Sequence, residues 1–265
     1  MIIRISFLLI FALNLSIIPG QDSVDHSSTI RSLYTRALQD QQGYQWLAQL
    51  VAQGPRFAGS PQADSAVLHL QHLCDSLGLE TQLQPVTVPR WERGPQEVAY
   101  FKAGGQKYPL QTTALGGSVP TPPEGLSADL VEIEDFDQLD SLDLQGKIAF
   151  YNIPMDPSFI NTFFAYSEAV KQRFLGAVKA SQQGARAVII RSLSSSVNEF
   201  PHTGSMTYEG AARKIPAAAI STQDAERLHR ALDTSKQELE GYLRMQCRWR
   251  DSVSSYNHIA DWPGK

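Results

Sequence analysis

The sequence predicts an α/β fold, because apolar runs typical of buried strands alternate with helical patterns along the middle of the chain. Residues 147–153 and 187–190 are short and largely apolar, which favours strands buried on both faces. Between them, residues 169–183 repeat apolar side chains at helical spacing and stop at Gly184. This order predicts a β-α-β crossover.

The segment after this crossover predicts a strand, a helix and a long alternating strand. Residues 215–220 form the first strand, and Ser221 and Asp224 are suited to cap a helix that runs to Leu232. From 239 to 250 apolar and polar residues alternate strictly, so one strand with a buried face and a solvated face is expected. The solvated face carries three arginines, for which a structural role is expected and anion binding is the alternative: Arg244, Arg248 and Arg250.

The amino-terminal part predicts helices. Apolar residues recur at helical spacing over residues 30–38 and 44–51, which predicts two helices that pack together. Ser60-Pro61 supplies the N-cap and first-turn proline of a third helix, and Gly78 ends it. Residues 79–88 then alternate and contain Pro85, which predicts a strand at the edge of a sheet.

A β-rich module is expected from Trp91 onward. Strand-like runs at residues 98–101, 108–115 and 128–133 are separated by glycine and proline clusters. Four aspartates follow, but they lack the glycine and the terminal glutamate of a calcium loop, so a solvated helix or turn is expected there: Asp135, Asp137, Asp140 and Asp143.

Composition narrows the possible partners. The chain has 265 residues, a formal net charge of −4 and 42% hydrophobic residues, which is typical of a globular protein. Because lysine and arginine are not in excess, nucleic acid is not expected as a partner. The composition does not favour binding to a membrane surface either.

The first twenty residues predict a secretory signal peptide. Arg4 precedes an apolar run from Ile5 to Ile18, and Pro19-Gly20 ends it. The run is shorter than the roughly 20 apolar residues that span a bilayer, so cleavage near Gly20 is expected and an uncleaved anchor is the alternative. After cleavage no membrane span is expected, and the protein would be secreted or periplasmic.

The remaining reactive side chains favour structural roles. Cys74 and Cys247 lie on apolar sides of predicted elements; export would permit a disulfide between them, but their spacing does not predict one. Serine hydrolase chemistry is not indicated, because no Gly-x-Ser-x-Gly motif occurs and residues 192–196 read as a flexible loop. Four histidines are expected at solvated or structural positions: His69, His72, His229 and His258.

Several short motifs occur in order along the chain. They lie at residues 54–61 (GPRFAGSP), 91–94 (WERG), 114–119 (ALGGSV), 144–148 (LQGKI), 191–193 with 200–206 (RSL and FPHTGSM), and 214–221 (KIPAAAIS). Together they resemble the carboxypeptidase Q (plasma glutamate carboxypeptidase) family of zinc-dependent exopeptidases. The resemblance spans nearly the whole chain after the signal, and it is specific because different motifs occur in the expected order.

The resemblance implies an α/β peptidase domain interrupted by an inserted protease-associated domain. By analogy, residues 1–20 are the signal peptide and 21–90 the amino-terminal part of the peptidase domain. Residues 91–250 are then the mixed α/β protease-associated domain, and 251–265 begin the returning peptidase domain. The peptidase sheet is therefore expected to be incomplete in this chain.

The resemblance also locates the chemistry of the family. Its members hold two zinc ions with a His-x-Asp pair, a bridging Asp, a Glu-Glu pair, a further acid and a late His, all downstream of the strand matched here by Ile259 and Ala260. No catalytic residue or metal ligand is therefore expected in this chain. His202 and Ser205, in a loop that faces the cleft by resemblance, are the candidates for contact with a short peptide substrate.

Two hypotheses follow. The first is the amino-terminal fragment of a secreted zinc metallopeptidase that hydrolyses dipeptides or short peptides, inactive alone, whose full-length form could be a homodimer. The second is a non-catalytic secreted module whose protease-associated domain binds a peptide or a protein. The first hypothesis is preferred. If this chain were the final product, its unfinished sheet would leave an exposed edge and unburied apolar helices, which favour aggregation.

Overall fold

The computed structural model describes residues 25–235 and 238–264, so the predicted signal peptide at residues 1–20 lies outside the described residues. The chain divides into two compact units, Met1–Ala52 and Gln53–Lys265. Each unit is described by itself. None of the helices in the described ranges is long and apolar enough to cross a membrane.

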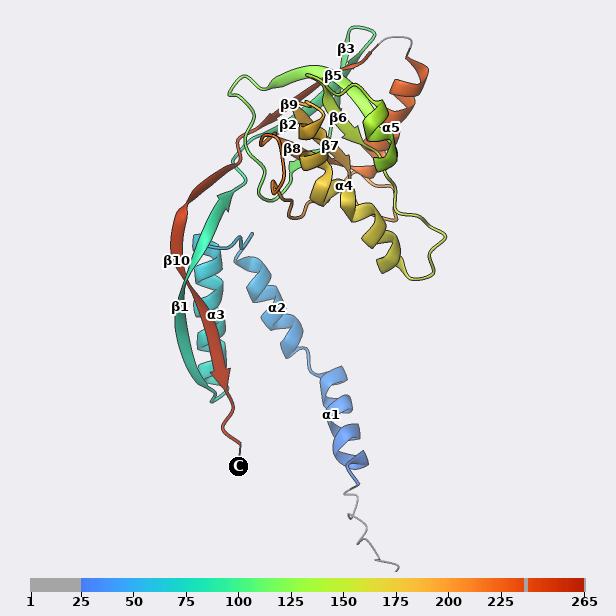
Figure 1. Ribbon diagram of the computed structural model, residues 1–265. Coiled ribbons are helices and arrows are strands. Elements are labelled where there is room, and N and C mark those ends of the chain that lie inside the picture. Colours follow the sequence, from blue (N-terminus) through green and yellow to red (C-terminus); the bar gives the residue numbers. More distant parts are fainter. Residues whose placement is uncertain (1–24, 236–237, 265) are drawn as a thin grey trace, which may run out of the picture. The chain divides into compact units, whose positions relative to one another are not determined.

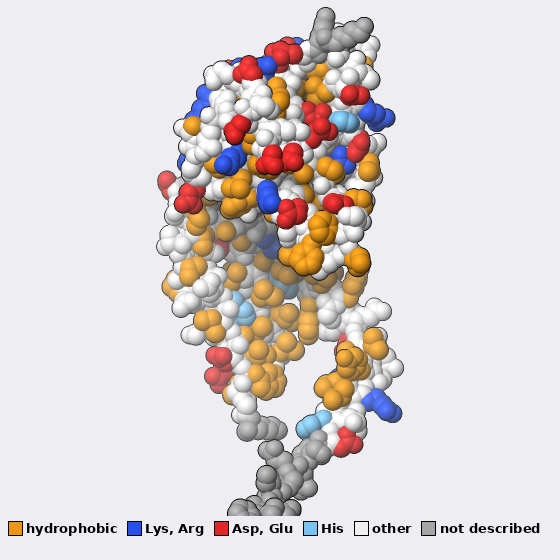
Figure 2. Space-filling view, turned by 45° about the vertical axis from the view of Figure 1, so that its right-hand side comes forward, with side chains coloured by type: hydrophobic (Ala, Val, Ile, Leu, Met, Phe, Trp, Pro, Cys, Tyr) orange, Lys and Arg blue, Asp and Glu red, His pale blue; other side chains and the backbone are white. Residues whose placement is uncertain are grey.

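The first unit contains two helices, α1 (Ser27–Gln39) and α2 (Gln42–Ala52), as the sequence predicted. The expectation that they pack together through buried apolar stripes is wrong for this unit, because no residue of either helix is buried. Leu38 is 84% exposed and Leu47 is 55% exposed. Apolar side chains are visible at the surface of the molecule in Figure 2.

The second unit is built on an eight-stranded mixed sheet, in the order β3-β2-β9-β5-β6-β7-β8-β4 (Figure 1). Strands β5 to β8 are parallel, and the outer pairings are antiparallel. The strands are β2 (Glu97–Ala103), β3 (Gln106–Leu110), β4 (Thr112–Ala114), β5 (Leu126–Ile133), β6 (Ile148–Tyr151), β7 (Ala187–Arg191), β8 (Ala217–Ile220) and β9 (Glu240–Met245).

Two helices cover opposite faces of this sheet, which gives the mixed α/β fold expected from the sequence. Side chains of the central strands alternate between two apolar cores; Ala177 and Ala180 of α4 (Thr162–Gln182) lie in one core. Ala225 and Leu228 of α5 (Thr222–Thr234) lie in the other. The predicted β-α-β crossover is β6-α4-β7, with α4 beginning earlier than expected because Asn161 caps it. The aspartate-rich segment is the short 3-10 helix η1 (Phe136–Ser141), which agrees with the expected turn.

A separate two-stranded ribbon leads into and out of the eight-stranded sheet and its two helices, which together are called the sandwich below. β1 (Glu80–Glu92) pairs antiparallel with β10 (Arg248–Asp261), from Glu80 opposite Asp261 to Glu92 opposite Arg248. Helix α3 (Pro61–Ser76) packs on the ribbon, and Asp64 accepts a hydrogen bond from Ser255 at 3.0 Å. Ser60 caps this helix, as the sequence predicted.

The single strand expected at residues 239–250 is two strands, which is a correction. β9 ends at Met245 in the large sheet and β10 begins at Arg248 in the ribbon. Cys247, 0% exposed, points into the core and contacts the carbonyl of Ser118. The apolar alternation continues through this break, so periodicity could not reveal it.

Two tryptophans connect the ribbon to the sandwich. Trp91 of β1 and Trp249 of β10 lie opposite each other in the ribbon. The indole N–H of Trp91 donates to the carbonyl oxygen of Ser118 at 2.9 Å, and that of Trp249 donates to Gly117 at 3.0 Å. Both bonds hold the same loop, so the ribbon and the sandwich share one anchoring point.

Arg93 and Phe57 complete this junction. Phe57 lies edge-on to Trp91, with ring centroids 5.8 Å apart, and the Arg93 guanidinium lies 5.2 Å from the Trp91 ring. Arg93 also donates to the carboxylate of Glu97 at 2.9 Å and to the carbonyl of Ala114 at 2.6 Å. Motifs at residues 54–61, 91–94 and 114–119 therefore meet in space.

We expect Trp91→Ala to destabilise the second unit by about 3 to 5 kcal/mol, because a buried indole is lost and the Ser118 carbonyl keeps only the weak thiol donor of Cys247. Denaturant unfolding followed by far-UV circular dichroism measures this change. Trp262→Ala is the matched control: Trp262 is 70% exposed, so its loss should cost less than about 0.5 kcal/mol. Equal effects of the two substitutions would contradict the role given to Trp91.

Candidate functional site

The candidate site is the loop between β7 and β8, which carries His202 and Ser205. It begins at the carboxyl end of a parallel strand, the edge where ligands bind in open α/β sheets. Ser192, 2% exposed, accepts a hydrogen bond from the His202 backbone N–H at 2.7 Å. The same hydroxyl donates to the carbonyl of Ile220 at 2.6 Å. The main chain at His202 is thus tied to the core of the sheet.

A second anchor holds the far end of this loop. The N–H of Gly116 donates to the carbonyl of Gly204 at 2.8 Å, and the N–H of Met206 donates to the carbonyl of Gly116 at 3.1 Å. A Cβ atom on Gly116 would lie 3.3 Å from the Gly204 oxygen, so a side chain there would require the Gly204 backbone to shift by a few tenths of an ångström. Thr203 also donates from its hydroxyl to Ala114 at 2.8 Å.

The two anchors leave the candidate side chains open to solvent. His202 and Ser205 are both exposed, on a main chain that is held at each end. This arrangement could present an imidazole and a hydroxyl to a ligand with little loss of backbone entropy. Contact with substrate remains a prediction for both residues.

An open hollow of about 520 Å³ lies beside the start of this loop. Its walls include Phe163 and Tyr166 from the first turns of α4, and Leu193 and Ser194 from the loop. Arg173 donates to the Tyr166 hydroxyl at 2.6 Å and lies against Gly204, where a Cβ atom would come within 2.6 Å of its guanidinium carbon. Arg173 therefore links one wall of the hollow to the candidate loop.

A second group of polar side chains was not recognised from the sequence. Glu132 and Glu134, at the end of β5, lie near His229 of α5, with ligand atoms within 4.8 Å of one another. The Nδ1 atom of His229 is 2.9 Å from a Glu132 oxygen. That hydrogen bond to Glu132, reinforced by the charges of Glu132, Glu134 and Asp233, raises the pKa of His229 above its ordinary value, against the opposing effect of burial.

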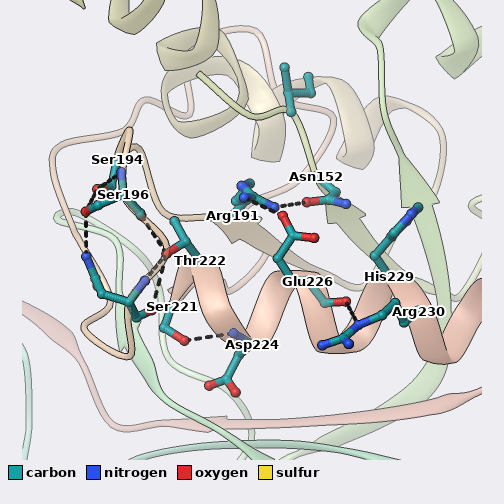
Figure 3. A network of polar contacts seen from close by, with 12 residues as sticks. Asn152, Arg191, Ser194, Ser196, Ser221, Thr222, Asp224, Glu226, His229 and Arg230 are labelled. Atoms are coloured by element: carbon teal, nitrogen blue, oxygen red, sulfur yellow. Dashed lines mark hydrogen bonds and ion pairs between the residues drawn. The ribbon is translucent and has the colours of Figure 1, made fainter. Parts of the chain in front are cut away.

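Further contacts orient this second group. The Asn152 amide donates to Glu132 at 2.7 Å, and Arg191 donates to the Asn152 oxygen at 3.1 Å. Arg191, 7% exposed, also forms an ion pair with Glu226 at 2.7 Å. Figure 3 shows Arg191 with Asn152 and Glu226, and His229 on the same helix as Glu226. The sequence predicted an ordinary position on a surface helix for His229, because its carboxylate partners are remote in the chain.

The cysteines and the remaining histidines considered in the sequence analysis lie outside these two polar groups. Cys74 and Cys247 are free thiols, so the structure contains no bridge between them. Burial raises the pKa of the Cys247 thiol to about 11. His72 is exposed as expected, whereas His69 is half-buried with its Nε2 enclosed and unpartnered, which corrects the expected solvated position. The Nε2 of His258 is similarly enclosed.

Comparisons with solved structures show that this fold is similar to that of peptidases. The fold is similar to that of a peptidase M28 precursor from Shewanella amazonensis SB2B, with a TM-score of 0.81 and 34% identity over 89% of this chain and 53% of that one. It is also similar to a zinc aminopeptidase from Bacillus subtilis, with a TM-score of 0.53 and 25% identity over 82% of this chain and 45% of that one. No family model matches the sequence.

Curated relatives show a more particular similarity. Carboxypeptidase Q of Bos taurus is 34% identical over 91% of this chain and 49% of its own length. The protein of the same name in Homo sapiens is 33% identical over the same shares. The chain is therefore similar to carboxypeptidase Q over nearly its whole length, and it spans about half the length of the curated relatives that it matches.

We expect Ser192→Ala to lower the free energy of unfolding by about 1 to 3 kcal/mol, because the His202 N–H loses its buried acceptor. Hydrogen exchange should also become faster at residues 200–206. Ser195→Ala is the control, since Ser195 is exposed in the same loop. Unchanged exchange at 200–206 in the Ser192 variant would show that this hydroxyl does not hold the loop.

Iodoacetamide should modify Cys74 and spare Cys247 in the native protein. Cys247 is 0% exposed and its thiol pKa is about 11, so its thiolate is scarce near neutral pH, while Cys74 is partly exposed. Peptide mapping by mass spectrometry gives the two rates, and labelling in denaturant is the control. Equal native rates would mean that the Cys247 environment opens readily.

Proposed function

We propose that this chain is the amino-terminal part of a secreted or periplasmic zinc-dependent exopeptidase that hydrolyses dipeptides or short peptides, and that it is inactive alone. The observation that carries the proposal is the match to carboxypeptidase Q over 91% of this chain but only 49% of the relative. Export rests on the signal-like composition of residues 1–20.

The proposed domain division places the peptidase domain at residues 21–90 and 251–265, with the protease-associated domain at 91–250. It is supported by the ribbon, in which Glu92 lies opposite Arg248. The chain therefore leaves the ribbon and returns to it at neighbouring positions. Adjacent ends are what allows one domain to be inserted into another.

The described residues do not fit the paired zinc site of such an enzyme. Paired metal ions polarise a scissile carbonyl and generate hydroxide at neutral pH. The described residues offer one group of three possible ligands, Glu132, Glu134 and His229, and it lies within the proposed inserted domain without a His-x-Asp pair. The ligands of the two expected zinc ions would come from the half of the family sequence that this chain does not match.

For the chain itself we propose a role in enclosing the substrate. His202 and Ser205 would contact the peptide, and the hollow beside Phe163 and Tyr166 would accommodate an apolar part of it. Its apolar walls and the hydroxyl of Ser194 suit a short peptide. A homodimer of the full-length enzyme is a further proposal, and nucleic acid is not proposed as a partner.

Sequencing the source DNA beyond the codon for Lys265, followed by peptidase assays, tests this function. We expect the reading frame to continue into a His-x-Asp motif and a later Glu-Glu pair, and the extended protein to hydrolyse dipeptides with zinc. The 265-residue chain should show no hydrolysis under the same conditions. In the extended protein, His202→Ala should raise KM more than it lowers kcat, since His202 contributes to binding.

Two outcomes would overturn this proposal. Zinc-dependent hydrolysis by the 265-residue chain would disprove inactivity of the chain alone. A stop codon directly after Lys265, together with specific binding of a peptide or protein by the chain, would favour a non-catalytic module.

A further inference from the structure

We propose that Glu132, Glu134 and His229 form a binding site for a divalent transition metal ion such as Zn²⁺, located in the eight-stranded-sheet region. The site joins two elements that are nearly one hundred residues apart in sequence, the end of β5 and the middle of α5. Its existence does not depend on the proposed peptidase activity.

The donor atoms already lie close to a coordinating arrangement. Metal bonds of about 2.0 to 2.1 Å at tetrahedral angles place neighbouring donor atoms about 3.3 Å apart. The Nδ1 atom of His229 lies 2.9 and 3.1 Å from the two Glu132 oxygens. All three residues offer a ligand atom within 4.8 Å of the others. Shifts of a few tenths of an ångström at Glu132 and His229, with rotation of the Glu134 side chain, would admit an ion.

The chemistry of the donors selects the class of metal. An imidazole nitrogen with two carboxylates is a borderline donor set that suits zinc and its neighbours better than calcium, which takes oxygen ligands. Two negative carboxylates would balance the charge of a divalent ion. With three protein ligands, water would complete the coordination.

The surrounding contacts orient the most buried ligand. Asn152 donates a hydrogen bond to Glu132 at 2.7 Å and accepts one from the buried Arg191. Arg191 in turn forms an ion pair with Glu226. Outer contacts of this kind fix ligand geometry in metal sites, and losing one costs about 10- to 100-fold in affinity. The Glu132 oxygen that accepts from Asn152 lies 2.9 Å from the Nδ1 atom of His229, and the other Glu132 oxygen lies 3.1 Å from it.

The group is also accessible. The side chain of His229 is 38% exposed and that of Glu132 is 15% exposed. Glu134 is exposed, and its carboxylate forms no ion pair with any described residue. An ion could therefore enter from solvent, and Glu134 would be free to complete the site.

Titration of the EDTA-treated 265-residue chain with zinc chloride, followed by calorimetry, tests the proposal. We expect saturable binding of one ion per chain. Glu134→Gln and His229→Gln should each weaken it at least about tenfold. The matched controls are Glu209→Gln and His72→Gln, which change exposed residues outside the group. Co²⁺ should give a visible absorption spectrum that changes in Glu134→Gln.

Thermal unfolding separates a metal site from a simple ion pair. Zinc should raise the Tm of the wild-type chain and of both control variants, because binding to the folded state stabilises it. The increase in Tm should be much smaller for Glu134→Gln. Without zinc, Glu134→Gln should unfold like the wild type. Failure to observe saturable binding, or equal zinc affinity in Glu134→Gln and wild type, would overturn the proposal and leave Glu132 and His229 as an ion pair only.

Discussion

The structure of the second unit depends on how two tryptophans hold one loop. Trp91 and Trp249 face each other across the ribbon and donate to the adjacent carbonyls of Ser118 and Gly117. Both strands of the ribbon continue toward the eight-stranded sheet, so these bonds fix the point where one structure becomes the other. The neighbouring Gly116 then bonds to Gly204, which carries the same constraint into the candidate loop.

This junction brings into contact motifs that are far apart in the sequence. Arg93 lies over Trp91 and bonds to Ala114, while Thr203 of the candidate loop donates to the same Ala114 carbonyl. Burial of the indole and pairing of these backbone groups stabilise one another. The junction therefore fixes the position of the candidate loop relative to the ribbon.

The two polar groups of the sandwich lie at the same edge of the parallel strands and differ in their supports. His202 is positioned through its backbone, by a serine that is itself buried. His229 is positioned through its ring, by a carboxylate that an amide and an arginine orient. The first arrangement leaves the side chain free for a ligand, whereas the second prepares a set of ligand atoms.

The sequence by itself determined the order and type of most elements, the α/β class, the helix caps at Ser60 and Ser221, and the family resemblance. These features depend on local periodicity and on short motifs, both of which involve residues close together in the sequence. Tertiary structure decided the break between Met245 and Arg248, because alternation does not record a change of sheet. It also decided the exposure of the α1 and α2 stripes and the meeting of Glu132 with His229. Contacts between residues far apart in sequence arise only when the chain folds, so no local pattern could show them.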